Sequence, residues 1–270
     1  MSEKILRLAL VGKDVSKSKS EQIHTFILKE FGYTCEYERV SVAKIDFDGV
    51  MRRLLGDFDG FNVTIPYKRD VMSYLDGVNG DAMDFGSVNT VVSASLQGYN
   101  TDGIGFMLML RLANIEVKDK KILVLGGGGA GRSTAVILKK AGGHVYVYQR
   151  RKDKLEELCQ ELGLHPADDP ESGAYDIVIN CTGVGMHESE GVSPVSERAF
   201  VGASCAVDLI YEPSESEFLR LAKNKGLCTL NGMAMLFFQA YYSDCLYIDK
   251  MPSDDEAQRL YEKYLTEEKI

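Results

Sequence analysis

The stretch KILVLGGGGAGRSTAVILKK, residues 121–140, decides the fold. It opens with an apolar run typical of a buried strand, passes through four glycines and continues with the pattern of a helix. Gly126, Gly128 and Gly131 form a G-x-G-x-x-G motif between the strand and the helix, which is the context that the motif requires. Glycines let the backbone approach a pyrophosphate, and free N–H groups at the helix start bind its charge. The stretch therefore predicts a Rossmann-type dinucleotide site; a glycine-rich turn without a ligand is the alternative.

The end of the next strand distinguishes between the two nicotinamide dinucleotides. The strand HVYVY, residues 144–148, is followed by Gln149, Arg150 and Arg151. An NAD site usually carries an acidic residue at this strand end, about 20 residues after the glycine motif, to bind the ribose 2′-hydroxyl. A guanidinium instead matches the geometry of the 2′-phosphate of NADP. A solvated run of charges is the alternative, but cations at the start of a helix oppose its macrodipole. We therefore expect NADP as the cofactor.

Strands and helices alternate on both sides of this stretch. Ahead of it, buried-strand patterns at 7–12 and 60–65 flank predicted helices, Ser20 is a plausible N-cap, and residues 87–103 read as a β-hairpin. DFDGVMRRLLG, residues 46–56, predicts a helical turn or two. After residue 120 the same rhythm starts again. The pattern predicts an α/β fold with mainly parallel sheets in two domains, which meet near Asp102 and Gly103.

The composition limits the partners. The 270 residues carry a formal net charge of -9 and a pI of about 5.1, which disfavours a nucleic-acid binder. No apolar run approaches the ~20 residues that span a bilayer, and the start MSEKILRLALVG does not match a signal peptide. The six cysteines lack C-x-x-C spacing, which disfavours a disulfide framework or a zinc site and favours a reducing compartment. The four histidines are not spaced like the ligands of a metal site. We expect a cytoplasmic protein that binds neither nucleic acid, membrane nor metal.

The stretch GFNVTIPYKRD, residues 60–70, places polar residues around a short strand that ends at Pro66. A glycosylation sequon at Asn62 does not fit the expected compartment, which leaves an ordinary edge strand or the rim of a catalytic site. Ligands of open α/β sheets bind at the carboxyl ends of strands. Among the polar residues there, Lys68 and Asp102 are a titratable pair of the kind that moves the proton when a secondary alcohol is oxidised. The others are Ser16, Ser18, Ser20, Asn62, Thr64, Asn89, Thr90, Asn100 and Thr101. Taken singly, each could be an ordinary turn, cap or solvent-facing residue.

Together these motifs resemble the shikimate dehydrogenase family, NADP-dependent enzymes of aromatic amino-acid biosynthesis. SKSKSEQIH at 16–24 looks like the family's serine segment, GFNVTIPYK like its G-x-N-V-T-x-P-x-K, and GYNTDG at 98–103 like its aspartate segment. The resemblance puts Lys68 and Asp102 on the catalytic lysine and aspartate. It implies that the substrate is bound by Ser18, Ser20, Thr64, Asn89, Tyr211 and Gln239. It implies that NADP is bound by Gly126, Gly128, Gly129, Ala130, Gly131, Gln149, Arg150, Arg151, Thr182, Gly183, Val184, Gly232 and Met235.

The resemblance also implies a reaction and a division of labour. The reaction is the reversible NADPH-dependent reduction of 3-dehydroshikimate to shikimate, with the substrate carboxylate on Ser18 and Ser20. Residues 1–102 with 232–270 would form the substrate-binding catalytic domain, to which the C-terminal helices return. Residues 103–231 would form the Rossmann-type NADP-binding domain.

Some positions depart from the family pattern. Lys17 and Glu21 stand where the family often has His and Pro, CTG at 181–183 replaces a more usual Ala-Thr-Ser, and the chain has no Trp. These departures bear on loop conformation and substrate preference, so a quinate/shikimate dehydrogenase with broader substrate or cofactor use is the alternative. A non-catalytic NADP-binding sensor is another, although a sensor has no reason to keep the Lys68–Asp102 pair. The sequence leaves a monomer and a homodimer both open.

Overall fold

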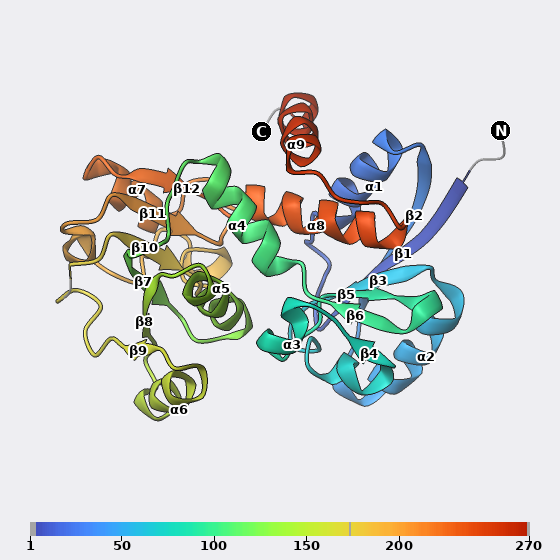
Figure 1. Ribbon diagram of the computed structural model, residues 1–270, viewed down its shortest axis with the longest axis horizontal. Helices are drawn as coiled ribbons and strands as arrows, with labels where there is room; N and C mark the ends of the chain where they lie inside the picture. The colour runs from blue at the N-terminus through green and yellow to red at the C-terminus, as the bar shows by residue number, and fades with distance from the viewer. Residues whose placement is uncertain (1–3, 173, 269–270) are drawn as a thin grey trace. The chain divides into compact units, whose positions relative to one another are not determined.

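The computed structural model describes residues 4–172 and 174–268. The chain divides into two compact units, Met1–Leu108 with Leu236–Ile270 and Met109–Met235. Both division points fall inside helices, α4 (Asp102–Leu112) and α8 (Met233–Tyr247). Each unit contains its own sheet covered by helices, which confirms the predicted α/β class (Figure 1).

The first unit is built on a mixed, mainly parallel sheet. Its strands are β1 (Lys4–Gly12), β2 (Tyr33–Ser41), β3 (Gly60–Val63), β4 (Gly77–Val78), β5 (Thr90–Val92) and β6 (Gln97–Tyr99). They lie in the order β2-β1-β3-β5-β6-β4, with β1 parallel to both of its neighbours. Strands β5 and β6 pair antiparallel, so the expected hairpin is confirmed. The carboxyl ends of β1 and β3 therefore open on the same edge of the sheet.

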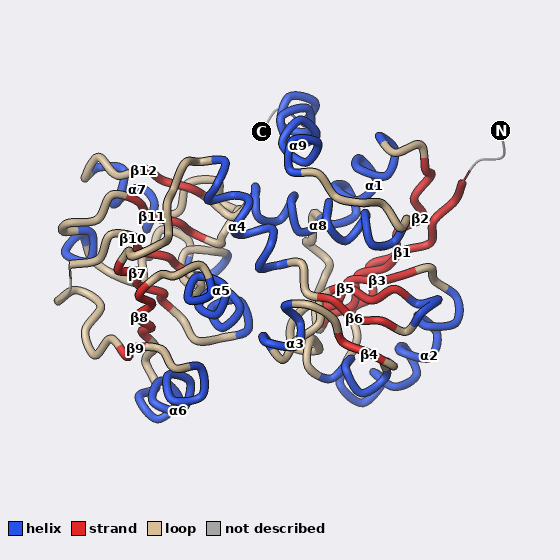
Figure 2. The backbone as a smooth tube through the Cα atoms, viewed as in Figure 1, coloured by secondary structure: helices blue, strands red, loops and turns tan. Residues whose placement is uncertain are grey.

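Both faces of this sheet are covered (Figure 2). The helices are α1 (Ser20–Glu30), α2 (Phe47–Asp57), α3 (Asp81–Phe85), most of α8, and α9 (Asp254–Glu268), with short 3₁₀ turns η1 (Lys44–Asp46), η2 (Asp70–Tyr74) and η3 (Ser93–Ser95). Ala9 and Val11 of β1 pack on α2, whereas Leu6 and Leu8 pack on α1 and α8. Burial on both faces explains why β1 is a nearly continuous apolar run.

The C-terminal helices pack on the first unit, as the family resemblance implied. The ring of Phe26 in α1 lies 6.3 Å from that of Phe237 in α8 and 5.2 Å from that of Tyr264 in α9. These contacts bring residues near the two ends of the chain into one apolar core.

The second unit is a doubly wound parallel sheet. Its strands are β7 (Lys121–Leu125), β8 (His144–Tyr148), β9 (His165–Pro166), β10 (Ile177–Asn180), β11 (Cys205–Asp208) and β12 (Cys228–Leu230), in the order β12-β11-β10-β7-β8-β9. Its helices are α5 (Gly129–Lys140), α6 (Lys152–Leu162) and α7 (Glu217–Asn224), with η4 (His187–Ser189) and η5 (Glu197–Phe200). All of its strand pairs are parallel. The Rossmann-type prediction is confirmed, and the strand order reverses at β7, where such sheets bind ligands.

Two local predictions were wrong. Ser20 is not an N-cap but the first residue of α1; Lys19 precedes it, and the Ser18 hydroxyl accepts from the Ser20 N–H at 3.2 Å. The helix α2 is 11 residues long instead of one or two turns. Packing of its apolar face on the sheet sustains α2 despite Gly49, since tertiary contacts outweigh intrinsic helix propensity. Among the described residues, no helix is long and apolar enough to cross a membrane.

Candidate active site

Lys68 and Asp102 form a direct pair in the first unit. The Lys68 ammonium lies 2.6 Å from Asp102 Oδ2, and the other carboxylate oxygen accepts from Asn89 Nδ2 at 2.8 Å. Asp102 is the first residue of α4, where the helix dipole favours a carboxylate. The side chains of the pair keep 21% and 14% of their surface exposed, so the pair is held in place yet open to a ligand.

The turn after β3 aims Lys68 by anchoring its neighbour. Tyr67 is buried, its hydroxyl donates to the Val42 carbonyl at 2.7 Å, and its ring stacks on Phe47 at 4.3 Å. The Lys68 carbonyl accepts from the Val88 N–H at 2.8 Å. With the backbone fixed on both sides, the lysine side chain has little freedom to leave the carboxylate. Thr64, three residues before Tyr67, is half-buried in the same turn.

Asn89 is oriented by a buried hydrogen-bond network. Its Oδ1 accepts from the Thr90 hydroxyl and from the Thr101 N–H, each at 2.9 Å, so Nδ2 must face Asp102. Gln239 of α8 reaches the same Nδ2 at 3.5 Å. The network therefore gathers Asn89, Gln239 and the Lys68–Asp102 pair at one place.

Ser243 completes this network and was missed by sequence reasoning. Its hydroxyl lies 2.8 Å from that of Thr90 and 3.1 Å from that of Thr101, and it donates to the Gln239 carbonyl at 2.9 Å. The only indication of this role in the sequence was a hydroxyl side chain within a strongly apolar helix. Ser243 thus fixes α8 against Thr90 and Thr101, the residues that follow Asn89 and precede Asp102.

The two predicted serines lie together in the first unit. The hydroxyls of Ser18 and Ser20 are 3.0 Å apart at the start of α1 in the first unit. Tyr211 belongs to the second unit, after β11, where burial and then the charge of Glu212 raise its pKa. No hydrogen bond among the described residues joins Ser18 or Ser20 to Lys68 or Asp102, so the share of both serines in substrate binding remains a prediction, as does that of Tyr211.

The glycine turn leaves room for a pyrophosphate. A Cβ on Gly131 would lie 1.9 Å from the Gly126 carbonyl oxygen, so only glycine lets α5 approach the turn this closely. Gly126 itself has φ +100°, a conformation that favours glycine. Gly128 and Gly129 are exposed with open space above them, and no side chain caps the helix start. The unpaired N–H groups of the first turn, which includes Ala130, are therefore available to an anion.

The segment after β8 lies beside this turn. A Cβ on Gly127 would meet Gln149 Oε1 at 2.5 Å, so the glutamine side chain covers the turn. Arg151 is paired with Asp153 at 2.9 Å, whereas Arg150 is exposed and forms no ion pair within the described part of the chain. Arg150 is thus free to bind a 2′-phosphate, and the residues present fit NADP.

The loop after β10 is held by a polar network that sequence reasoning did not find. Asn180 Oδ1 accepts from the Thr182 N–H at 3.0 Å and its hydroxyl at 2.6 Å, while Nδ2 donates to the Val184 carbonyl at 3.2 Å. Gly183 lies between them on the surface. The same Nδ2 donates to the buried Asp208 at 3.1 Å. This network sets the shape of residues 181–186.

Asp208 is the support of that network. It is fully buried and also accepts from the Ser216 hydroxyl at 2.5 Å and the Ile210 N–H at 3.0 Å. Burial raises its pKa, and these hydrogen bonds and that of Asn180 oppose the rise. The only acid in the apolar strand CAVD was the signal in the sequence.

The remaining cofactor candidates follow β12. The Gly232 N–H donates to the Ile210 carbonyl at 3.0 Å, and a Cβ there would come within 2.1 Å of the Leu209 carbonyl oxygen. Gly232 therefore lets this turn pack on the segment after β11. Met235 is half-buried in the first turn of α8.

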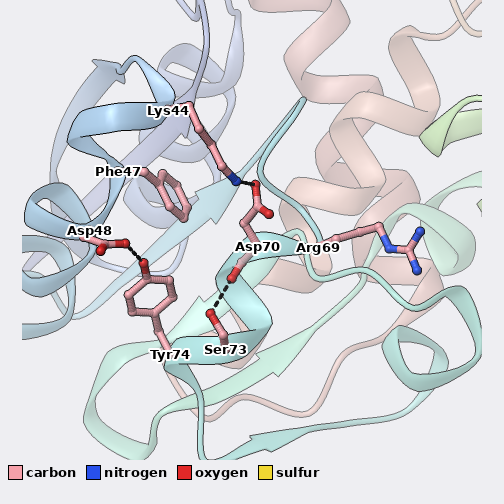
Figure 3. A pocket seen from close by; sticks show the side chains of 7 residues that line it. All are labelled: Lys44, Phe47, Asp48, Arg69, Asp70, Ser73 and Tyr74. Atoms are coloured by element: carbon pink, nitrogen blue, oxygen red, sulfur yellow. Dashed lines mark hydrogen bonds and ion pairs between the residues drawn. The ribbon is translucent and has the colours of Figure 1, made fainter.

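A cavity of about 330 Å³ lies beside the lysine turn but contains none of the predicted site residues (Figure 3). Its lining is Lys44, Phe47, Asp48, Arg69, Asp70, Ser73 and Tyr74. The Lys44 ammonium pairs with Asp70 at 2.5 Å, and the Tyr74 hydroxyl donates to Asp48. Lys44 and Asp70 therefore neutralise each other, and we assign no catalytic group to this cavity. The described residues also contain no cluster of three metal-binding side chains.

Comparisons with known proteins identify the family of the chain. The model of the shikimate dehydrogenase substrate binding domain matches residues 10–91. The shikimate dehydrogenase (NADP(+)) of Thermus thermophilus is 35% identical over 250 residues, covering 92% of this chain and 94% of that protein. That of Carboxydothermus hydrogenoformans is 37% identical over 245 residues, covering 85% and 87%.

Solved structures give the same result. The shikimate 5-dehydrogenase of Thermus thermophilus in complex with NADP(H) and shikimate matches with a TM-score of 0.87 at 33% identity, covering 96% of this chain and 99% of that one. A chorismate mutase/shikimate 5-dehydrogenase fusion protein from Clostridium acetobutylicum matches with a TM-score of 0.90 at 33% identity over 100% of both chains. By sequence and by fold alike, this chain belongs to the shikimate dehydrogenase family.

Proposed function

We propose that this chain catalyses the reversible NADPH-dependent reduction of 3-dehydroshikimate to shikimate, an oxidoreductase step of the shikimate pathway. The observation that carries the proposal is the Lys68–Asp102 pair at 2.6 Å, held open to a ligand in a member of this family. The relatives are named for NADP(+), and the Thermus thermophilus structure contains NADP(H) and shikimate.

The pair supplies the proton of the reaction. Reduction of the ketone adds a hydride to the carbonyl carbon and a proton to its oxygen; bound NADPH supplies the hydride. The Lys68 ammonium donates the proton to the oxygen as it becomes a hydroxyl, and Asp102 orients the ammonium and accepts from a neighbouring substrate hydroxyl. Lys68 regains a proton from solvent, which its exposed surface allows. In the reverse direction the neutral lysine accepts the hydroxyl proton.

The first unit would hold the substrate. The adjacent hydroxyls of Ser18 and Ser20, at the positive start of α1, suit the substrate carboxylate. Asn89 and Gln239 lie at the Lys68–Asp102 pair and suit the ring hydroxyls. We assign further substrate contacts to Thr64 and Tyr211 by family resemblance.

The second unit would hold NADP. The glycine turn binds the pyrophosphate, Arg150 the 2′-phosphate, and Gln149 and Arg151 flank the same end of the cofactor. Thr182, Gly183 and Val184, with Gly232 and Met235, line the nicotinamide side. In the predicted division, residues 103–231 serve the cofactor, and residues 1–102 with 232–270 serve the substrate, apart from Gly232 and Met235 at the start of the latter segment. We further propose a cytoplasmic enzyme, monomeric or homodimeric, without membrane or nucleic-acid partners.

A side-by-side assay tests the function. Purified protein is given 3-dehydroshikimate or 3-dehydroquinate with NADPH or NADH, and cofactor absorbance is followed. We expect the highest kcat/KM for 3-dehydroshikimate with NADPH. Faster turnover of 3-dehydroquinate would indicate the quinate alternative, to which the departures at Lys17 and Glu21 are relevant. Binding of NADPH without turnover of either ketone would indicate a sensor.

A further inference from the structure

A buried polar cluster lies among α1, β2 and α8 of the first unit. His24 of α1 and Asp244 of α8 are both 0% exposed, and Nδ1 of the imidazole lies 2.6 Å from Oδ1 of the carboxyl group. The ring of Tyr37 stacks on His24 at 5.2 Å, and that of Tyr247 lies 6.4 Å away. Nothing in the proposed reaction uses these four side chains.

The cluster is costly for the stability of the fold. His24 Nε2, Asp244 Oδ2 and the Tyr247 hydroxyl have no hydrogen-bond partner in the described part of the chain. Burial raises the pKa of Asp244 to about 6, against the opposing charge and hydrogen bond of His24. A buried ionic pair is often no more stabilising than two apolar side chains of similar size. Stability alone therefore does not explain the pair, and the unpaired atoms suit ordered water.

The cluster connects the two segments that are assigned to the substrate. Ser20 and His24 are four residues apart in α1 and both are buried, so they share one face of the helix. On α8, Asp244 directly follows Ser243, which binds the Gln239 carbonyl. The Tyr37 hydroxyl, like the three atoms named above, has no hydrogen-bond partner in the described part of the chain. The His24–Asp244 bond thus joins the start of α1 to the polar part of α8.

We propose that His24 and Asp244 are positioning residues for the substrate. Their hydrogen bond, with ordered water on the remaining polar atoms, fixes Ser18 and Ser20 relative to Gln239 and so sets the affinity for a cyclic polyhydroxy carboxylate. A hydrogen bond has a preferred direction and length, whereas apolar side chains would hold the two helices together without fixing their register. The inference rests on the proposed function, because it concerns the same substrate residues.

The test separates positioning from stability. The variants are Asp244→Leu, the double variant His24→Leu/Asp244→Leu, and Asp244→Asn, which keeps the acceptor. The dissociation constant for shikimate is measured by calorimetry without cofactor, beside the thermal midpoint. Asp244→Leu should lower the midpoint, since it leaves His24 unpaired. The double variant should regain the midpoint yet bind shikimate about tenfold more weakly, and Asp244→Asn should keep most of the affinity.

A control on the same helix is available. Tyr241→Phe removes the hydrogen bond from Tyr241 to Glu256 of α9 at 2.9 Å and should leave shikimate affinity unchanged. In turnover with NADPH, the double variant should raise the KM for 3-dehydroshikimate with little change in kcat. The KM for NADPH should not move.

Several results would overturn the inference. If the double variant were as stable as the wild type and bound shikimate with wild-type affinity, His24 and Asp244 would have only a structural role. If the double variant does not fold, His24→Phe keeps a ring against Tyr37, and wild-type affinity there would count equally against it. Wild-type protein that binds no shikimate would overturn the proposed function, and this inference with it; binding that no variant alters overturns the inference alone.

Discussion

Lys68 is the residue on which the proposed chemistry depends. Lys68→Ala should lower kcat by about 10²–10⁴-fold, the usual contribution of a positioned proton donor. Shikimate binding and the thermal midpoint should change little, because the side chain is partly exposed and Asp102 keeps the Asn89 hydrogen bond and the helix N-terminus. Steady-state kinetics and calorimetry measure these effects.

The neighbouring residue provides the control for that variant. Arg69 is exposed and carries the same charge one position along the chain. Arg69→Ala should leave kcat close to the wild-type value, which separates the role of Lys68 from local charge. Near-normal kcat in Lys68→Ala would mean that another group supplies the proton.

Arg150 should decide the preference between the two cofactors. Arg150→Ala removes a charge-assisted contact of about 1.5–3 kcal/mol, so the KM for NADPH should rise about 10–150-fold while that for NADH stays nearly constant. Arg151→Ala is the matched comparison and should have a smaller effect, because that guanidinium already pairs with Asp153. Unchanged discrimination between NADPH and NADH in the Arg150 variant would contradict the assignment.

At this scale the sequence predicts the residues that stand in motifs but not those that support them. Lys68 and Asp102 follow strand ends and match a family pattern, so each could be named. Ser243 and Asp208 stand out as polar side chains in an apolar helix and an apolar strand, but the local pattern does not show what they bind. Their partners come from segments distant in the sequence, and no local rule brings Thr90 or Asn180 to them.

At the scale of elements, β11 carries a carboxyl group whose titration should affect stability. Because burial raises the pKa of Asp208 above that of the unfolded chain, the folded state binds this proton more tightly. The contribution of Asp208 to the free energy of unfolding is therefore fully present below its unfolded pKa of about 3.9. It is lost as pH rises through the pKa of Asp208 in the folded protein. The free energy of unfolding of the wild type, relative to Asp208→Asn, should fall as pH rises through that range. Urea unfolding over a pH series measures it.

An exposed aspartate gives the opposite expectation. The hydrogen bond from Arg151 lowers the pKa of Asp153, so its stability contribution is present above the unfolded pKa and is lost as pH falls. The wild type relative to Asp153→Asn should gain stability, weakly, as pH rises. If the stability of the wild type relative to Asp208→Asn also rose with pH, burial would not be the dominant influence on the pKa of Asp208.

The elements themselves were largely predictable where the local pattern and the packing agree. The glycine turn between β7 and α5 follows from residues 121–140, since it needs only contacts close in sequence, such as Gly131 against Gly126. The helix α2 was underestimated because Phe47, Met51 and Leu54 are stabilised by a sheet that the local sequence does not contain. The start of α1 was misplaced by one residue, as helix ends often are.

At the scale of the whole molecule, contacts between distant segments were the least predictable. The periodicity of α8 and α9 shows helices but not their partner, which Phe26 of α1 supplies through Phe237 and Tyr264. The His24–Asp244 bond spans 220 positions of the chain. Two buried polar residues could not be recognised as a pair until the fold placed α1 and α8 on the same face of the sheet.

Thiol reactivity should report on the integrity of the complete fold. Burial raises the pKa of Cys35, Cys181, Cys205 and Cys245 to about 12 and also raises that of Cys159, whereas Cys228 is exposed. A thiol pKa near 12 reduces the reactive thiolate about a thousandfold relative to an ordinary cysteine. In mildly alkaline solution an aromatic disulfide reagent should therefore modify Cys228 quickly in the native protein, and all six cysteines only after unfolding. Cys228→Ser should abolish the fast phase; a fast phase that persists in this variant would mean that one of the other five thiols reacts in the native protein.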